Sequence, residues 1–129
     1  MQPKMVIIDP SPDLLEALAH LIRGRGWGVR TASSLAKASA LIDAFEPHVV
    51  LAGVERPMEI GVSFAQRVRQ LHDGHVLLMA MSASPPPDVR AQDAGVFDLI
   101  CHKPVMEGGV DAIERKAAER FPSLLSEPT

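Results

Sequence analysis

The chain alternates short, continuous apolar runs with longer segments in which apolar residues recur at helical spacing, and no other feature constrains its fold as strongly. A run that is apolar at every residue suits a strand covered on both faces, whereas the spacing of Leu14, Leu18 and Ile22 suits one face of a helix. Strands are expected at Met5–Asp9, Gly28–Thr31, His48–Gly53, His75–Met81 and Asp98–Cys101. Helices are expected after the N-cap Ser11, after the N-cap Ser34 up to Phe45, after Gly61, from Ser84 to Gly95 and from Met106 to Arg120, with a loop at Val54–Ile60.

Five strands alternating with five helices predict an α/β fold with a doubly wound parallel sheet and helices on both faces. Right-handed crossovers leave few topologies, and the three-layer, flavodoxin-like (βα)5 arrangement with strand order 2-1-3-4-5 is the one expected at this size. Sites in such sheets form where the strand order reverses, here between the first and third strands. Asp9 and Gly53 are therefore expected to be neighbours.

The composition narrows the class of protein. The 129 residues, 47% hydrophobic and 22% charged, are expected to form one domain over residues 1–121, followed by a polar tail at 122–129. The net charge of −3 argues against direct binding to nucleic acid. Cys101 is the only cysteine, and no segment approaches the ~20 apolar residues of a membrane span, so a cytoplasmic protein without disulfides is expected.

Chemically distinctive residues stand at the ends of successive expected strands. Asp9 ends the first, Gly53 the third and Ser82 the fourth, while Lys103-Pro104 follows the fifth. This order resembles the receiver domain of bacterial two-component signalling, and the resemblance extends from about Met5 to about Arg120.

The resemblance implies that the chemistry of phosphorylation is incomplete. Receiver domains end the first strand with two adjacent acids that bind Mg²⁺, and here that pair reads Asp9-Pro10. The aspartate that accepts the phosphoryl group corresponds to Gly53, a position supported by the spacing to Pro57 and Gly61. Glycine has no side chain with which to form an acyl phosphate, and Asp9 alone is a weak Mg²⁺ ligand set, so no cofactor is expected.

The remaining family positions are partly kept. Ser82 matches the hydroxyl that binds a phosphoryl oxygen, although a serine at a strand end also commonly bonds the local backbone. Lys103 matches the family lysine, is expected to pair with Asp9 or face water, and precedes Pro104, which is cis in the family. Ile100 stands where an aromatic switch residue is usual, in a segment one residue longer than normal. Glu55 is expected to be a solvated loop residue rather than a replacement acid.

The resemblance therefore predicts a non-enzymatic pseudo-receiver that acts through protein contacts. Its expected partners are a histidine kinase or another regulatory protein, and a homodimer through the face of the fourth helix, fifth strand and fifth helix. One alternative is a working phospho-receiver that uses Glu55 or Ser82. Another is a flavodoxin-like module that binds a small ligand.

Among the other residues, Trp27 is expected to be packed or half-exposed at the edge of the second strand. His72 and His75 are expected to be ordinary surface residues, and Cys101 a buried structural thiol.

Overall fold

The computed structural model describes residues 2–54, 58–72, 75–83 and 96–125. Its elements in chain order are β1 (Lys4–Ile8), α1 (Pro12–Arg23), β2 (Gly28–Ala32), α2 (Leu35–Phe45), β3 (Val49–Gly53), α3 (Met58–His72), β4 (Leu77–Ser82), β5 (Leu99–His102), α5 (Glu107–Arg120) and α6 (Pro122–Leu125). The helix expected at Ser84–Gly95 lies outside the described residues.

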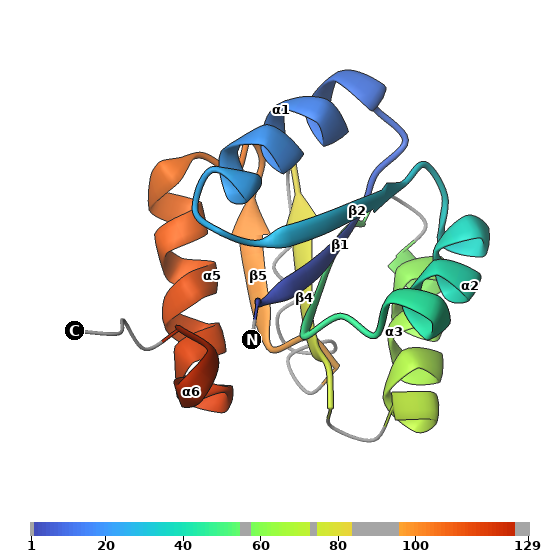
Figure 1. Ribbon diagram of the computed structural model, residues 1–129. Coiled ribbons are helices and arrows are strands. Elements are labelled where there is room, and N and C mark those ends of the chain that lie inside the picture. The colour runs from blue at the N-terminus through green and yellow to red at the C-terminus, as the bar shows by residue number, and fades with distance from the viewer. Residues whose placement is uncertain (1, 55–57, 73–74, 84–95, 126–129) are drawn as a thin grey trace.

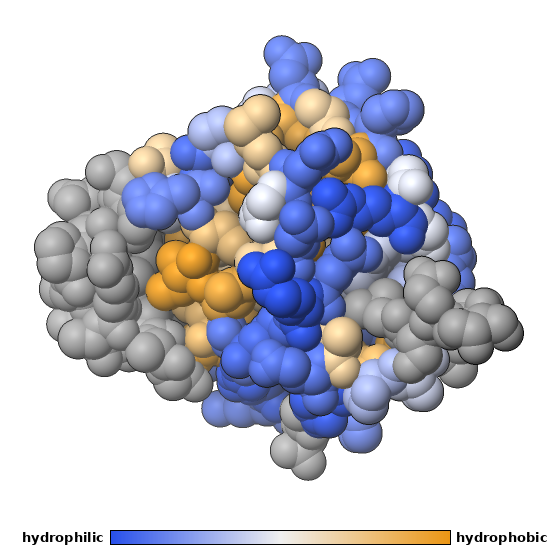
Figure 2. All heavy atoms as spheres, turned by 90° about the vertical axis from the view of Figure 1, so that its left-hand side faces the viewer, coloured by the Kyte–Doolittle hydropathy of each residue, from blue (hydrophilic) through white to orange (hydrophobic). Residues whose placement is uncertain are grey.

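One parallel sheet organises the chain, with the strand order β2-β1-β3-β4-β5. Figure 1 shows α1 and α5 on one face of this sheet and α2 and α3 on the other. The three-layer flavodoxin-like fold and its strand order, both predicted from the sequence, are confirmed. Figure 2 shows the α5 side of the molecule, where hydrophobic and hydrophilic residues are mixed on the surface.

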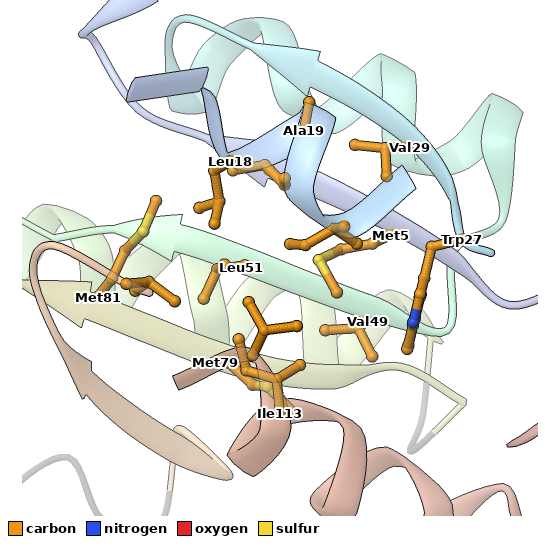
Figure 3. Packing of buried hydrophobic residues seen from close by; sticks show 14 of the residues in the cluster. Met5, Leu18, Ala19, Trp27, Val29, Val49, Leu51, Met79, Met81 and Ile113 are labelled. Atoms are coloured by element: carbon orange, nitrogen blue, oxygen red, sulfur yellow. The ribbon is translucent and has the colours of Figure 1, made fainter. Parts of the chain in front are cut away.

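Each central strand contributes alternate side chains to two separate cores. Leu51 of β3 packs in the core under α1 and α5, whereas its neighbours Val50 and Ala52 pack in the core under α2 and α3. Figure 3 shows Leu51 in the first core with Met79 and Ile113. This alternation explains why β1, β3 and β4 are apolar at almost every residue, because both faces of these central strands are covered.

Serine hydroxyls begin two of the helices, as the sequence predicts. The Ser11 hydroxyl accepts a hydrogen bond from the Leu14 amide at 3.2 Å, and the Ser34 hydroxyl accepts one from the Lys37 amide at 3.2 Å. Each bond satisfies an amide that has no partner within its own helix.

One expected boundary is wrong, and one helix was not expected. Helix α3 begins at Met58 rather than after Gly61, because a glycine weakens a helix without being sufficient to end it. The segment expected to be a polar tail begins with helix α6, Pro122–Leu125. Pro122 ends α5 but suits the first position of a new helix, where its missing amide hydrogen is not needed.

Trp27, His72 and Cys101 differ in their burial and contacts. Trp27 is packed, with 2% of its surface exposed, and is not half-exposed at the sheet edge. His72 pairs with Asp43, with 3.2 Å between Nε2 and Oδ1. Cys101 is half-buried rather than fully buried, and this burial raises the pKa of its thiol.

No helix in the described part of the chain is both long and apolar enough to cross a bilayer.

A polar contact joins Trp27 to helix α5. The indole Nε1 donates to Glu114 Oε2 at 3.0 Å, and Arg25 donates to the other oxygen of Glu114 at 2.8 Å. Glu114 therefore satisfies a buried donor and a guanidinium together, and it fixes the turn before β2 against α5.

We expect Glu114→Ala to lower the free energy of unfolding by about 1–2 kcal/mol, because a buried indole donor loses its acceptor. Asp111→Ala is the matched control, since it removes another carboxylate that binds Arg25 but is itself 54% exposed. That control should cost less than about 0.5 kcal/mol, as is usual for exposed ion pairs. Urea denaturation of the two variants tests the difference, and equal losses would contradict the role of Trp27.

At the same end of the sheet, where the strands begin, His48 links β1 to the segment before β3. Its Nδ1 accepts the Lys4 amide at 3.1 Å, its own amide donates to the Lys4 carbonyl at 2.8 Å, and its ring meets Phe121 edge-on at 5.3 Å. Burial, with a smaller contribution from the charge of Lys4, lowers the pKa of His48. The folded protein therefore favours the neutral imidazole.

Because this pKa is lower in the folded than in the unfolded chain, the unfolded chain takes up the proton first as the pH falls. Stability contributed by His48 is thus complete above the ordinary histidine pKa of about 6.5 and is lost below it. We expect the free energy of unfolding to fall more between about pH 7.5 and about pH 5.5 in the wild type than in His48→Gln. Glutamine can still accept the Lys4 amide but does not titrate, so equal pH dependence in both proteins would contradict the assignment.

Candidate functional site

Four strand ends meet at one edge of the sheet and carry the residues singled out in the sequence. Asp9 follows β1, Gly53 ends β3, Ser82 ends β4 and Lys103 follows β5. The parallel register aligns these ends, pairing Gly53 with Met81 and Ser82 with His102. The Lys103 amide donates to the Ser82 carbonyl at 2.8 Å, which fixes the chain after β5 beside the end of β4.

Asp9 is the buried charge at this edge, with only 1% of its surface exposed. Its Oδ2 accepts from the Lys103 ammonium at 2.6 Å, and its Oδ1 accepts from the Ser11 amide at 2.9 Å. The Asp9 amide donates to the Ala32 carbonyl at 3.1 Å. Both carboxylate oxygens are therefore engaged, as a buried charge requires. Of the two sequence-based expectations for Lys103, pairing with Asp9 is the one the structure shows.

Gly53 lies directly against this carboxylate. A β-carbon built on Gly53 would overlap Asp9 Oδ2 and would lie 3.1 Å from Asp9 Cγ and 3.3 Å from the Ile8 carbonyl oxygen. The Asp9 carboxylate thus occupies space that any larger residue at position 53 would need. The sequence indicated that position 53 lacks a side chain, but not that the side chain of Asp9 takes the space.

The other candidate residues surround this pair. Pro10 is exposed, Ser82 is 5% exposed, and Ile100 is half-buried against the core under α2 and α3. The peptide bond between Lys103 and Pro104 is cis. Glu55 lies outside the described residues.

Ser11 has a second role that the sequence analysis missed. It was identified only as the cap of α1, yet its amide also holds Asp9. A hydrogen bond from a backbone amide to the carboxylate two residues earlier is a common local motif. The aspartate two residues before Ser11 could therefore have predicted this contact.

The described residues offer no cluster suited to a metal. Among them, no group of three or more His, Cys, Asp or Glu side chains is placed to hold an ion. In the part of the chain that the structure describes, the buried carboxylate at the strand ends is that of Asp9, and it is already bound to the Lys103 ammonium.

Comparison with known proteins identifies the family. The family model of the response regulator receiver domain matches residues 5–113. This chain belongs to the receiver domain family. Receiver domains of two-component signalling are generally signalling modules rather than enzymes. No curated protein sequence gives a significant match.

Solved receiver domains share the fold at low sequence identity. A CheY-like receiver domain from Methanospirillum hungatei is 16% identical, with 95% of this chain and 99% of that chain covered and a TM-score of 0.85. A response regulator from Thermotoga maritima is 15% identical, with coverages of 92% and 99% and a TM-score of 0.84. The receiver domain of an HD domain-containing protein from Pseudomonas fluorescens is 18% identical, with coverages of 95% and 99% and a TM-score of 0.82.

The contact between Gly53 and Asp9 predicts that a single methyl group added at position 53 destabilises the fold. We expect Gly53→Ala to lower the free energy of unfolding by about 1–3 kcal/mol, because the methyl group displaces a carboxylate held on both oxygens. In an Asp9→Ala background the same substitution should cost at least about 1 kcal/mol less, since the overlapping atoms are gone. Chemical denaturation of the four proteins in this cycle measures the coupling.

Gly108→Ala is the matched control. A β-carbon at Gly108, in the first turn of α5, meets no other atom within 4 Å. This variant should be neutral or slightly more stable, because alanine favours a helix over glycine. Additive effects of Gly53→Ala and Asp9→Ala would show that the two positions do not compete for space.

Proposed function

We propose that this receiver domain acts as a phosphorylation-independent protein-interaction module. Gly53 would stand at the phosphoacceptor position, at the end of β3 and beside the end of β1. The observation that carries the proposal is the Asp9 carboxylate, which lies against Gly53 and binds Lys103. In the proposed site the acid that would form the acyl phosphate is absent, and a neighbouring carboxylate fills its space.

The donor set at the strand ends also argues against a strong Mg²⁺ site. Mg²⁺ prefers several oxygen ligands in octahedral geometry and gives up its waters reluctantly. Pro10 and Gly53 contribute no side-chain oxygen, and Asp9 Oδ2 is bound by the Lys103 ammonium at 2.6 Å. A cation would have to displace that ammonium before it could use both oxygens of Asp9. We therefore propose that Mg²⁺ binding is weak or absent.

The remaining positions fit a receiver domain that retains the fold but lacks the residues for phosphorylation. Ser82 and Lys103 would correspond to the family's phosphate-binding hydroxyl and lysine, and Pro104 to the family's cis proline. Ile100 would replace the aromatic switch residue. Its half-buried side chain packs against a hydrophobic core, which suits a fixed residue better than one that alternates between inward and outward positions.

In place of a phosphoryl group, a protein partner would bias the conformation. A ligand shifts a conformational equilibrium only by binding one state more tightly, and a partner protein can do so as well as a covalent group. The proposed partners are a histidine kinase or another regulatory protein, and a second copy through the side that carries β5 and α5. Leu99 and Cys101 on β5 are half-buried and Met106, just before α5, is 67% exposed; Figure 2 shows hydrophobic surface on this side.

Intact-mass spectrometry after incubation with Mg²⁺ and acetyl phosphate tests the proposal. We expect no phosphoryl adduct on the wild type. The comparison protein is the double variant Pro10→Asp/Gly53→Asp, which restores the second acid and the phosphoacceptor together. Restoring both is necessary because an aspartate at position 53 meets Asp9, and a bound Mg²⁺ would draw the Asp9 carboxylate away from that space.

An adduct on the double variant alone would support a receiver scaffold disabled at its nucleophile. An adduct on the wild type would refute the proposal, and peptide mapping would then show whether Glu55, Ser82 or another residue accepts the phosphoryl group.

A further inference from the structure

We propose that the strand ends form an anion-binding site whose resident ligand is the protein's own Asp9 carboxylate. This inference deepens the proposed function and rests on it for one point, that residue 53 is not itself phosphorylated. It adds that the site is closed to soluble anions because a tethered one already occupies it.

Lys103 and Asp9 form a nearly buried pair of opposite charges. The side chain of Lys103 is only 16% exposed and its ammonium lies 2.6 Å from Asp9 Oδ2, whose residue is 1% exposed. A charge with so little contact with water is costly unless an opposite charge or strong hydrogen bonds compensate it. Lys103 therefore favours an anion at the place where Oδ2 now lies.

The Asp9 carboxylate lies in the space directly beside Gly53. Oδ2 overlaps the position of a β-carbon on residue 53, so the carboxylate lies within the volume that a side chain at this position would enter. Only glycine leaves that volume open. Gly53 and Asp9 thus act together: glycine leaves the space of a side chain at position 53 empty, and the negatively charged carboxylate of Asp9 occupies it.

Two hydrogen bonds with the backbone hold Asp9 in place. The Ser11 amide holds the second carboxylate oxygen at 2.9 Å, and the Asp9 amide is bound to the Ala32 carbonyl at 3.1 Å. A carboxylate held this way needs little further ordering when it binds Lys103, because the local chain already orients it. A soluble anion would lose translational freedom on binding and so competes poorly with a tethered group.

It follows that removing the Asp9 carboxylate should uncover the site. Asp9→Ala leaves a gap lined by Gly53 and the Lys103 ammonium, and releases the Ser11 amide as a further donor. Charge-assisted hydrogen bonds from an ammonium and a backbone amide are a common way of binding phosphate. A group or partner that acts on this site in the wild type must break the contact between Asp9 and Lys103 first.

Inorganic phosphate is the probe, used without Mg²⁺ or any phosphodonor and at constant ionic strength. Titration calorimetry and thermal unfolding are expected to show that Asp9→Ala binds phosphate at least ten times more tightly than the wild type. The gain should disappear in Asp9→Ala/Lys103→Met, because the ammonium is then absent. Glu119→Ala is the control for net charge, since it removes an exposed acid from α5 and should leave phosphate affinity unchanged.

Asp9→Ser provides a second test if the alanine variant folds poorly, because its hydroxyl can still accept the Ser11 amide. The same tenfold gain is expected for it. Equal phosphate affinity in the wild type, Asp9→Ala and Asp9→Ser would overturn the inference, and so would a gain that survives the loss of Lys103. These readouts are reversible and need no phosphodonor, so they are distinct from the covalent adduct that would refute the proposed function.

Discussion

The contact between the Asp9 carboxylate and the Lys103 ammonium determines what the end of the sheet can do. It joins residues that follow β1 and β5, and so spans the central strands β3 and β4 that lie between them in the sheet. It neutralises the most buried charge of the site, and it places that charge against Gly53. A metal ion, a phosphate group or a partner that binds at the Asp9 carboxylate must therefore compete with Lys103.

The scaffold does not depend on the chemistry of the strand ends. Its two cores are built from strand residues that alternate between the faces of the sheet, and from the apolar faces of α1, α2, α3 and α5. A TM-score of 0.85 at 16% identity shows how far the sequence can change while this fold is kept. Because the strand-end residues contribute little to either core, a glycine can stand at the end of β3 without loss of the fold.

Local sequence patterns predicted the fold and the positions of the candidate residues at the strand ends. They did not predict the orientation of the Asp9 carboxylate. Continuous apolar runs, helix caps and the order of Asp9, Gly53, Ser82 and Lys103 are readable along the chain. The direction in which the Asp9 carboxylate turns depends on Lys103, 94 residues away, and on the room left by Gly53. The short helix at Pro122 was not predicted for a different, local reason: a proline that ends one helix can also begin another.

The packing of Trp27 has a spectroscopic consequence. The chain contains one tryptophan and no tyrosine, so emission excited at wavelengths that phenylalanine does not absorb comes from a single buried indole. That indole donates a hydrogen bond to Glu114 of α5. The protein thus carries an intrinsic optical probe between the turn before β2 and α5, whose emission responds to movement of that helix without any added label.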